Sequence, residues 1–424
     1  MVACGKGTSA GPDTPFPDAG GVSSADAGPV PGAENAAVLI IDANGGIAEA
    51  SHITVNGGHK VGDNVSGAPI LIDDISGTFD TITITNRSSE ELRVGGISAA
   101  SAALVLAISN EGASDVVLGG VIDNPIGSTT IRDATGDIRS VGSSTVRSNR
   151  LTLAAHALGS VSNRLVIELV RSSGQDCDLS AQASSDLFLE LTGQLHGLSA
   201  TDAAFASSEI AAGGAADLLL HAADLSGPIA STYQFQHLAG ANVVVIAPSA
   251  AAADAKTNLI ANTDLLGLGQ VDVLTNGDIG IVETAGDLRV GTIQSTAGDV
   301  SLATSGASGS ILDTNPAGGT VPSVIGNGVQ LSAANGAVGV LDNALEIDSS
   351  HQAPGRVRVV ARDGVFVTET QGDLNLDAVA SQHSDVLLAT LSGSMLDAAA
   401  DVQAEIQGAN IDLIAKGGGI GTDG

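Results

Sequence analysis

The residues best suited to acid–base chemistry are two adjacent aspartates, Asp73 and Asp74, in the run LIDDISG. Hydrolysis of a glycosidic bond needs two carboxyl groups that flank the same bond. Neighbouring residues of a strand point to opposite faces, so this pair could reach one substrate only at a bend. We therefore interpret Asp73 and Asp74 as a turn or strand-end pair, and we predict no catalytic residue.

Histidine and cysteine offer little for metal binding or nucleophilic catalysis. None of the 8 histidines lies in an HxH, HExxH or His/Cys spacing that typically holds zinc. His52 and His59, in SHITVNGGH, form the closest pair, and we interpret them as exposed turn residues. Cys177, in GQDCDLS, has no recognisable base beside it, so we expect a small buried side chain there.

Recurrent Gly-Asp pairs raise the question of calcium. The candidate ligands are Asp137, Asp278, Asp287 and Asp373. Calcium takes six to eight oxygen ligands, and the nine-residue period of the calcium-binding nonapeptide GGxGxDxUx is absent. An aspartate at a corner also caps a turn with its own side chain. We expect turn caps and weak counter-ion binding, without a resident cofactor, and ordered calcium at these positions stays open as the alternative.

The first 36 residues differ from the rest of the chain. They are small and polar, without an apolar face, and include prolines at positions 12, 15, 17, 29 and 31. This composition predicts a disordered, flexible tether. Its start, MVACG, resembles the end of a bacterial lipoprotein signal, which makes Cys4 a candidate for lipidation and for contact with a membrane. The alternative is an incidental cysteine in a linker.

Composition excludes several classes of protein. The chain of 424 residues carries 47 Asp and Glu against 16 Lys and Arg, for a net charge of −31. Nucleic-acid binding needs a basic surface, so it is excluded. No apolar run is long enough for a membrane-spanning helix. The mean hydropathy of +0.28 indicates a folded chain in spite of the charge.

From residue 37 onward, short runs rich in Val, Ile, Leu and Thr alternate with Gly, Asn, Asp and Ser. This is the pattern of strands and turns. Aromatic residues make up only 2% of the chain, as expected for a narrow interior that large rings do not fit repeatedly. We predict an all-β fold, a right-handed parallel β-helix (β-solenoid) over residues 37–424. A string of β-sandwich domains is the alternative, but it would normally contain buried Trp or Tyr.

A long repeat occupies residues 271–424. Residues 271–302 align without a gap to residues 357–388 at an offset of 86, and SGSILD at 308 matches SGSMLD at 392. VQLSAANGAVGVLDN (329–343) is similar to IDLIAKGGGIGTDG (411–424), and LTLAAHALGSVSN (151–163) is a looser copy. Four coils of ~21–22 residues would fill this unit, which predicts about 18 coils and a rod ~85 Å long. The open ends of such a rod invite end-to-end self-association.

The chain resembles the filamentous haemagglutinin-like, large repetitive surface proteins of bacteria. The resemblance is carried by the recurring pattern GD[ILV]…[ILV]xLxA…GxIxD and by the segments ITITNRSSEELRVGGI (82–97) and IDLIAKGGGIGT (411–422). The resemblance covers most of residues 37–424, and what is similar is the pattern of the repeats. It implies an adhesive rod that is extracellular or on the outer cell surface and binds a host-cell, matrix or biofilm component.

Parallel β-helices also include polysaccharide lyases and glycosidases, so an enzyme is the alternative function. The repeat is least regular at residues 171–260, where SAAAADAKTN (249–258) suggests a short helix. This stretch contains Arg171, His196, His221, Tyr233 and His237. We expect an elaboration of the side of the rod there, without a catalytic site.

Overall fold

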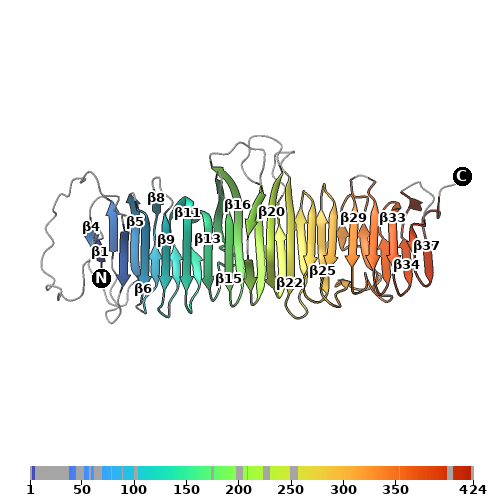
Figure 1. The fold of residues 1–424 in the computed structure, drawn as a ribbon, viewed down its shortest axis with the longest axis horizontal. Coiled ribbons are helices and arrows are strands. Elements are labelled where there is room, and N and C mark those ends of the chain that lie inside the picture. Colours follow the sequence, from blue (N-terminus) through green and yellow to red (C-terminus); the bar gives the residue numbers. More distant parts are fainter. Residues whose placement is uncertain are drawn as a thin grey trace.

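Alternation of apolar and polar residues folds the chain into a stack of coils. The computed structural model describes residues 2–4, 38–43, 52–56, 59–61, 69–77, 79–87, 89–99, 104–172, 176–196, 204–207, 209–222, 230–248, 256–352, 354–398 and 404–421. Within these ranges all regular structure is β, without a helix, and the strands run across an elongated body (Figure 1). The prediction of an all-β parallel solenoid is confirmed.

The strands pair in two ladders that alternate along the chain, here called ladder A and ladder B. Ladder A contains β3 (His52–Asn56), β5 (Ile70–Gly77), β7 (Leu92–Val94), β8 (Ile97–Ala99), β10 (Val116–Leu118), β12 (Ile138–Ser140), β14 (Leu165–Ser172), β16 (Leu187–His196), β19 (Ala215–His221), β21 (Asn242–Ile246), β23 (Val271–Thr275), β25 (Leu288–Ser295), β27 (Ile311–Asp313), β28 (Val324–Ile325), β30 (Leu345–Asp348), β32 (Val365–Glu369), β34 (Val386–Thr390) and β37 (Ile411–Ala415).

Ladder B contains β2 (Val38–Ala43), β6 (Thr81–Asn86), β9 (Val105–Asn110), β15 (Asp178–Ala183), β17 (Ala204–Ser207), β18 (Glu209–Ala212), β20 (Ser231–Gly240), β22 (Thr257–Leu265), β24 (Ile279–Glu283), β26 (Val300–Thr304), β29 (Val329–Ala333), β31 (Val357–Ala361), β33 (Leu374–Ser381), β35 (Met395–Asp397) and β36 (Ile406–Gln407). The long strands β11 (Val121–Asp133) and β13 (Thr145–Ala155) pass from ladder A into ladder B. Among the described strands, β1 (Val2–Cys4) pairs antiparallel with β2 and β4 (His59–Val61) pairs antiparallel with β3.

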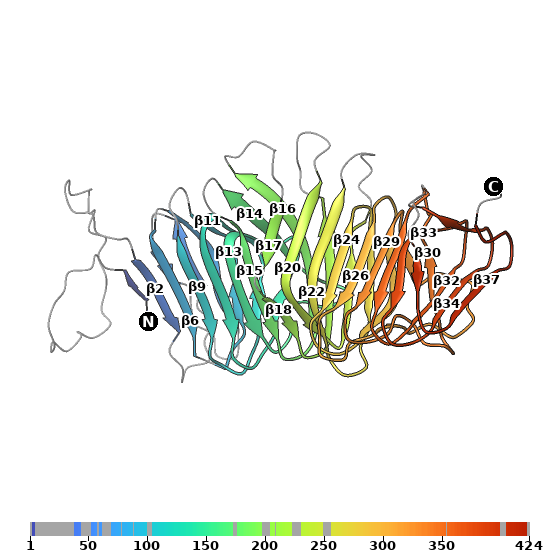
Figure 2. The same cartoon turned by 45° about the vertical axis from the view of Figure 1, so that its right-hand side comes forward.

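Successive strands of one ladder are stacked coils, and Figure 2 shows the same stack from another side. Thr263 pairs with Glu283, 20 residues further on, whereas Ser180 pairs with Glu209, 29 residues further on. The described stack has fewer coils than the 18 predicted, so at ~4.8 Å per coil it is also shorter than the predicted ~85 Å. Both predictions were too high, because the coils are longer and less uniform than the spacing of the strand-like runs suggested.

The 86-residue repeat spans three and a half coils and not four. Val271 begins β23 in ladder A, whereas its equivalent Val357 begins β31 in ladder B. Between them the chain returns to ladder A in β25, in β27 with β28, and in β30. Equivalent segments of the two copies therefore lie in different ladders, and 86 residues over three and a half coils give about 25 residues per coil.

Another resemblance within the sequence, between residues 151–163 and 329–343, corresponds to one local structure. Gly159 and Gly339 have φ angles of 67° and 66°, a region in which a β-carbon is strained. Each is followed by a tight turn closed by a pair of antiparallel backbone bonds, between Ser160 and Asn163 in one copy and between Val340 and Asn343 in the other.

The interior is filled by alternate residues of each strand, mostly Ile, Leu, Val and Ala. Phe205 and Tyr233 are the largest fully buried side chains among the described residues, with ring centroids 5.6 Å apart. A β-carbon on Gly193 would lie 2.2 Å from the ring of Phe205, so glycine provides the space for it. The prediction that rings are rare inside the solenoid therefore has a local exception between β17 and β20.

Stacking brings backbone close to backbone at the corners, and this can be tested at Gly355. An ideal β-carbon there would lie 1.1 Å from the backbone oxygen of Asn327. We expect Gly355→Ala to destabilise the fold by about 1–3 kcal/mol, because one coil must move. Gly280→Ala, whose nearest neighbour lies 3.9 Å away, is the control and should stay within about 0.5 kcal/mol. The measurement is the urea midpoint of unfolding, and equal midpoints for the two variants would contradict the close packing.

Candidate functional site

The four aspartates considered for calcium occupy corners, where each binds a backbone N–H of the next coil. Oδ1 of Asp137 accepts a hydrogen bond from Ala157 N at 3.1 Å. Oδ1 of Asp278, Asp287 and Asp373 accepts from Asp299 N, Ser310 N and Ser394 N at 3.0, 2.8 and 2.7 Å. We call this arrangement, one side-chain oxygen on one amide of the following coil, a corner staple.

Corner staples recur at other Asp and Asn residues just before or near the start of a strand. Other acceptors of the same kind are Asp115, Asp186, Asp272, Asp299, Asp385, Asn242 and Asn258. The Gly-Asp pairs seen in the sequence are therefore corners that link coils. This role extends beyond the local turn cap that the sequence suggested.

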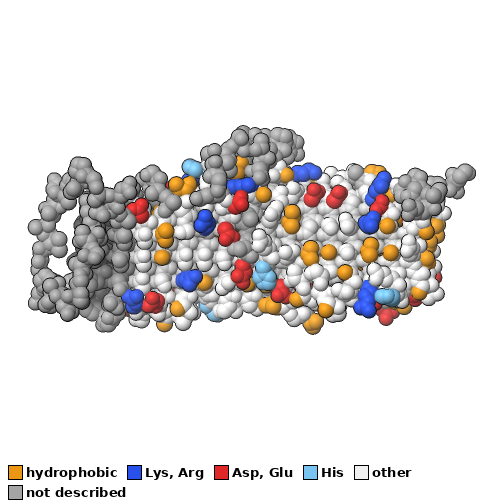
Figure 3. Space-filling model, in the orientation of Figure 1, with side chains coloured by type: hydrophobic (Ala, Val, Ile, Leu, Met, Phe, Trp, Pro, Cys, Tyr) orange, Lys and Arg blue, Asp and Glu red, His pale blue; other side chains and the backbone are white. Residues whose placement is uncertain are grey.

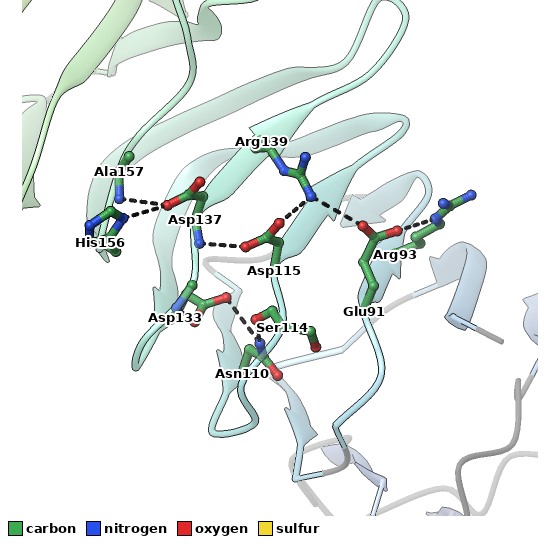
Figure 4. A network of polar contacts seen from close by, with 11 residues as sticks. Glu91, Arg93, Asn110, Ser114, Asp115, Asp133, Asp137, Arg139, His156 and Ala157 are labelled. Carbon is green, nitrogen blue, oxygen red and sulfur yellow. Dashed lines mark hydrogen bonds and ion pairs between the residues drawn. The ribbon is translucent and has the colours of Figure 1, made fainter. Parts of the chain in front are cut away.

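Figure 4 shows the staples with the charges around them near the N-terminal end of the stack. Asp137 N donates to Asp115, and Arg139 bridges the carboxylates of Asp115 and Glu91. Below them in this view, the amide of Asn110 donates to Asp133 at 3.0 Å. Both the staples with Arg139 and the bond between Asn110 and Asp133 join neighbouring coils. These polar contacts therefore add to the hydrogen bonding that stacks the strands.

No group of three or more His, Cys, Asp or Glu side chains suited to a metal ion occurs among the residues that the structure describes. Asp137 also contacts a ring nitrogen of His156 at 2.9 Å. Those parts of the chain also contain no helix long and apolar enough to cross a membrane.

Two glutamates that the sequence analysis missed are fully buried at equivalent positions of the repeat, Glu283 and Glu369. Each is the last residue of its strand. Glu283 accepts hydrogen bonds from the Thr263 hydroxyl and from Leu265 N, and Glu369 from the hydroxyl and N–H of Ser349. Burial raises the pKa of both, that of Glu369 to about 8.

Both glutamates could have been found from the sequence. In IGIVE and VFVTE, Ile279 and Val365 point inward, and the same parity places the glutamate four residues later inside.

The other residues singled out from the sequence are spread over several strands. Asp73 and Asp74 lie within β5, His52 in β3 and His59 in β4, but their side chains are outside the described part. Cys177 is in the core, with 2% exposure.

Of the predicted tether at residues 1–36, only 2–4 are described. They form β1, in which Cys4 pairs with Leu39.

Residues 171–260 contribute β15 to β21 to the stack together with parts of β14 and β22, and most of the suggested helix at 249–258 lies outside the described residues. Arg171 donates to the Ala204 carbonyl, and His221 contacts Glu190 at 2.9 Å. Tyr233 is buried and donates from its hydroxyl to the His221 carbonyl at 2.7 Å. His196 ends β16, and His237 lies at an irregularity of β20.

A surface groove of about 710 Å³ lies over ladder B. Its floor is one row of side chains in register on five successive strands, namely Ile260, Gly280, Ser301, Gln330 and Arg358. Two of the five are a glycine and a serine, which keeps the middle of the row low. We call this feature the ladder B groove.

The charges of the ladder B groove are divided along its length. Asp278 and Asp299 line one part, and both are held by corner staples. Arg356 and Arg358 line the other part, exposed and 3.5 and 3.4 Å from the shared carboxylate of Asp377. On the face of the rod in Figure 3, acidic and basic side chains are likewise interspersed.

Comparison with known proteins adds no relative: no family model, no curated protein and no solved structure matches this chain.

If corner staples stabilise the stack, two substitutions of Asp373 should differ in their effect on the stability of the fold. Asp373→Ala leaves Ser394 N without its acceptor and should lower stability by about 0.5–1.5 kcal/mol, whereas Asp373→Asn keeps an acceptor oxygen and should be close to wild type. Denaturant unfolding of both variants measures this. Equal losses would mean that the carboxylate charge, and not the hydrogen bond, is what matters.

The buried carboxyl group of Glu369 should make the stability of the folded chain depend on pH. Its pKa is about 8 in the folded chain and close to 4.3 when unfolded, so its contribution is complete below ~4.3 and is lost as the pH rises through 8. The free energy of unfolding of Glu369→Gln, minus that of wild type, should therefore rise between about pH 5 and pH 8 by up to ~1.4 kcal/mol per pH unit. Above pH 8 this difference should stay constant. Melting temperatures of both proteins across this range test it, and a constant difference would contradict it.

Proposed function

We propose that this protein is an adhesive rod, secreted or held on the outer surface of a bacterial cell, that presents the ladder B groove to a glycan of host cells or matrix. The observation that supports the proposal best is the register of the groove floor, in which five coils each supply one side chain to a continuous row. Such a row suits an extended polymer, because each coil adds one contact at the ~4.8 Å spacing of the stack.

The side chains of the groove favour an oligosaccharide with an acidic group at one end. Ser301 and Gln330 on the floor, with Asn258 and Asn327 beside it, provide hydrogen-bond donors and acceptors for hydroxyl groups. Arg356 and Arg358 carry guanidinium groups that pair well with a carboxylate. The carboxylates of Asp278 and Asp299 disfavour a polymer that is negatively charged along its whole length.

Rigidity supports the same proposal. Strands of the stack hold the floor, and staples fix Asp278 and Asp299 at the wall, so little order has to be gained when a ligand binds. A preorganised surface loses less conformational entropy on binding.

We expect two kinds of substitution to weaken glycan binding at least tenfold. Gly280→Val fills the middle of the groove, at a position where the backbone leaves space, and Arg356→Ala with Arg358→Ala removes the positive end. Arg93→Ala with Arg139→Ala makes the same change of charge outside the groove and should bind as wild type does. The measurement is binding of the full chain to neutral, carboxylate-terminated and sulfated oligosaccharides. Unchanged affinity in the groove variants would refute the proposal.

A polysaccharide-active enzyme is the second candidate, favoured by the position of Asp278 and Asp299 on adjacent coils of the same groove. Two carboxyl groups ~5–9.5 Å apart perform glycoside hydrolysis. The same incubations should therefore be assayed for new reducing ends or unsaturated products. Cleavage that Asp278→Asn or Asp299→Asn abolishes would replace adhesion by catalysis as the function.

A further inference from the structure

A pair of carboxyl groups lies outside the ladder B groove, where the chain leaves ladder A for the segment 314–323 and returns to it. Asp313 ends β27, Ser323 precedes β28, and Glu346 lies in the next strand of the ladder, β30. Ser323 N donates to the backbone oxygen of Glu346 at 2.8 Å, and Gly319 N donates to its carboxyl group. The segment therefore folds back against Glu346.

Asp313 is held in place by donors on both of its oxygens. Oδ1 accepts from Asn315 N and Oδ2 from the Ser323 hydroxyl, each at 2.7 Å. The Asn343 amide donates to the backbone oxygens of Asp313 and Asn315, each at 3.1 Å. These bonds fix the position of the Asp313 carboxylate, which lies near enough to Glu346 to interact with its carboxyl group.

Glu346 has an oxygen without a partner. The residue is only 3% exposed, and its Oε2 is buried and accepts no hydrogen bond. Glu283 and Glu369 show the contrast, because hydroxyl and backbone donors surround their carboxyl groups. A buried carboxyl group that has an unpartnered oxygen and a second carboxylate nearby requires either a proton or a cation to remove the repulsion.

Two negative charges on Asp313 and Glu346 would repel each other, which strengthens the need for a proton or a cation. Burial raises the pKa of Glu346 well above its usual range, and the neighbouring carboxylate of Asp313 raises it further. A bound cation would remove the same repulsion.

We propose that Asp313 and Glu346 together bind one divalent cation, with calcium as the preferred ion. Carboxylate oxygens are hard ligands of the kind that calcium selects, and two of them balance its charge. Calcium takes six to eight oxygens, so backbone carbonyls of the segment 314–323 and water must supply the others. Bound calcium would attach this segment to the neighbouring coil and stabilise the stack there.

The experiment is a titration of the full chain with calcium chloride and with magnesium chloride at pH 8, by calorimetry and by melting temperature. We expect one site of unit stoichiometry that prefers calcium and raises the melting temperature. Glu346→Gln and Asp313→Asn should each weaken calcium binding at least tenfold and remove the rise in melting temperature.

Matched controls separate this site from the acidic surface. Glu369→Gln replaces a buried glutamate whose oxygens already have donors, and Asp278→Asn replaces an exposed corner carboxylate, so both should bind calcium as wild type does. Two results would overturn the proposal. One is wild-type protein without a calcium-dependent rise in melting temperature. The other is the same rise in Glu346→Gln and Asp313→Asn, which would assign calcium to diffuse counter-ion binding.

Discussion

Hydrogen bonding between successive coils is the interaction on which the rest of this structure depends. Most of the described strands in the two ladders have backbone partners in the coil before and in the coil after them, so no coil is complete alone. At the corners, where strands end, carboxylates such as Asp278 and Asp373 continue this pairing by accepting an N–H of the next coil. The interior then needs only small and branched apolar residues, because the backbone holds the coils in register.

The fold class could be predicted from the sequence because alternation and turn residues are local signals. Strands such as Val300–Thr304 have the predicted alternation of inward and outward residues. The number of coils could not be predicted, because it depends on how much chain each turn contains. The repeat from Val271 to Val357 fills three and a half coils, a fractional number that no feature of the strand runs reveals.

Polar groups of the site were harder to predict, for two different reasons. Glu283 and Glu369 follow the inward parity of their strands, so the sequence contained the signal that they are buried. The pair of Asp313 and Glu346 has no such signal, because it forms only when the segment 314–323 folds back and Ser323 bonds to the backbone of Glu346. The ladder B groove likewise depends on register between strands far apart in sequence, from Ile260 to Arg358.

Part of the acidity of the chain is a consequence of its architecture. A corner staple uses one carboxylate oxygen on an amide and leaves the charge of the aspartate at the surface, so each such corner adds to the net charge of −31. Asparagine performs the same bonding at Asn242 and Asn258 without the charge, so bonding alone does not require aspartate. The charge itself favours solubility and opposes close approach of two rods. Ligand recognition is then better sought where basic side chains interrupt the acidic corners, as Arg356 and Arg358 do in the ladder B groove.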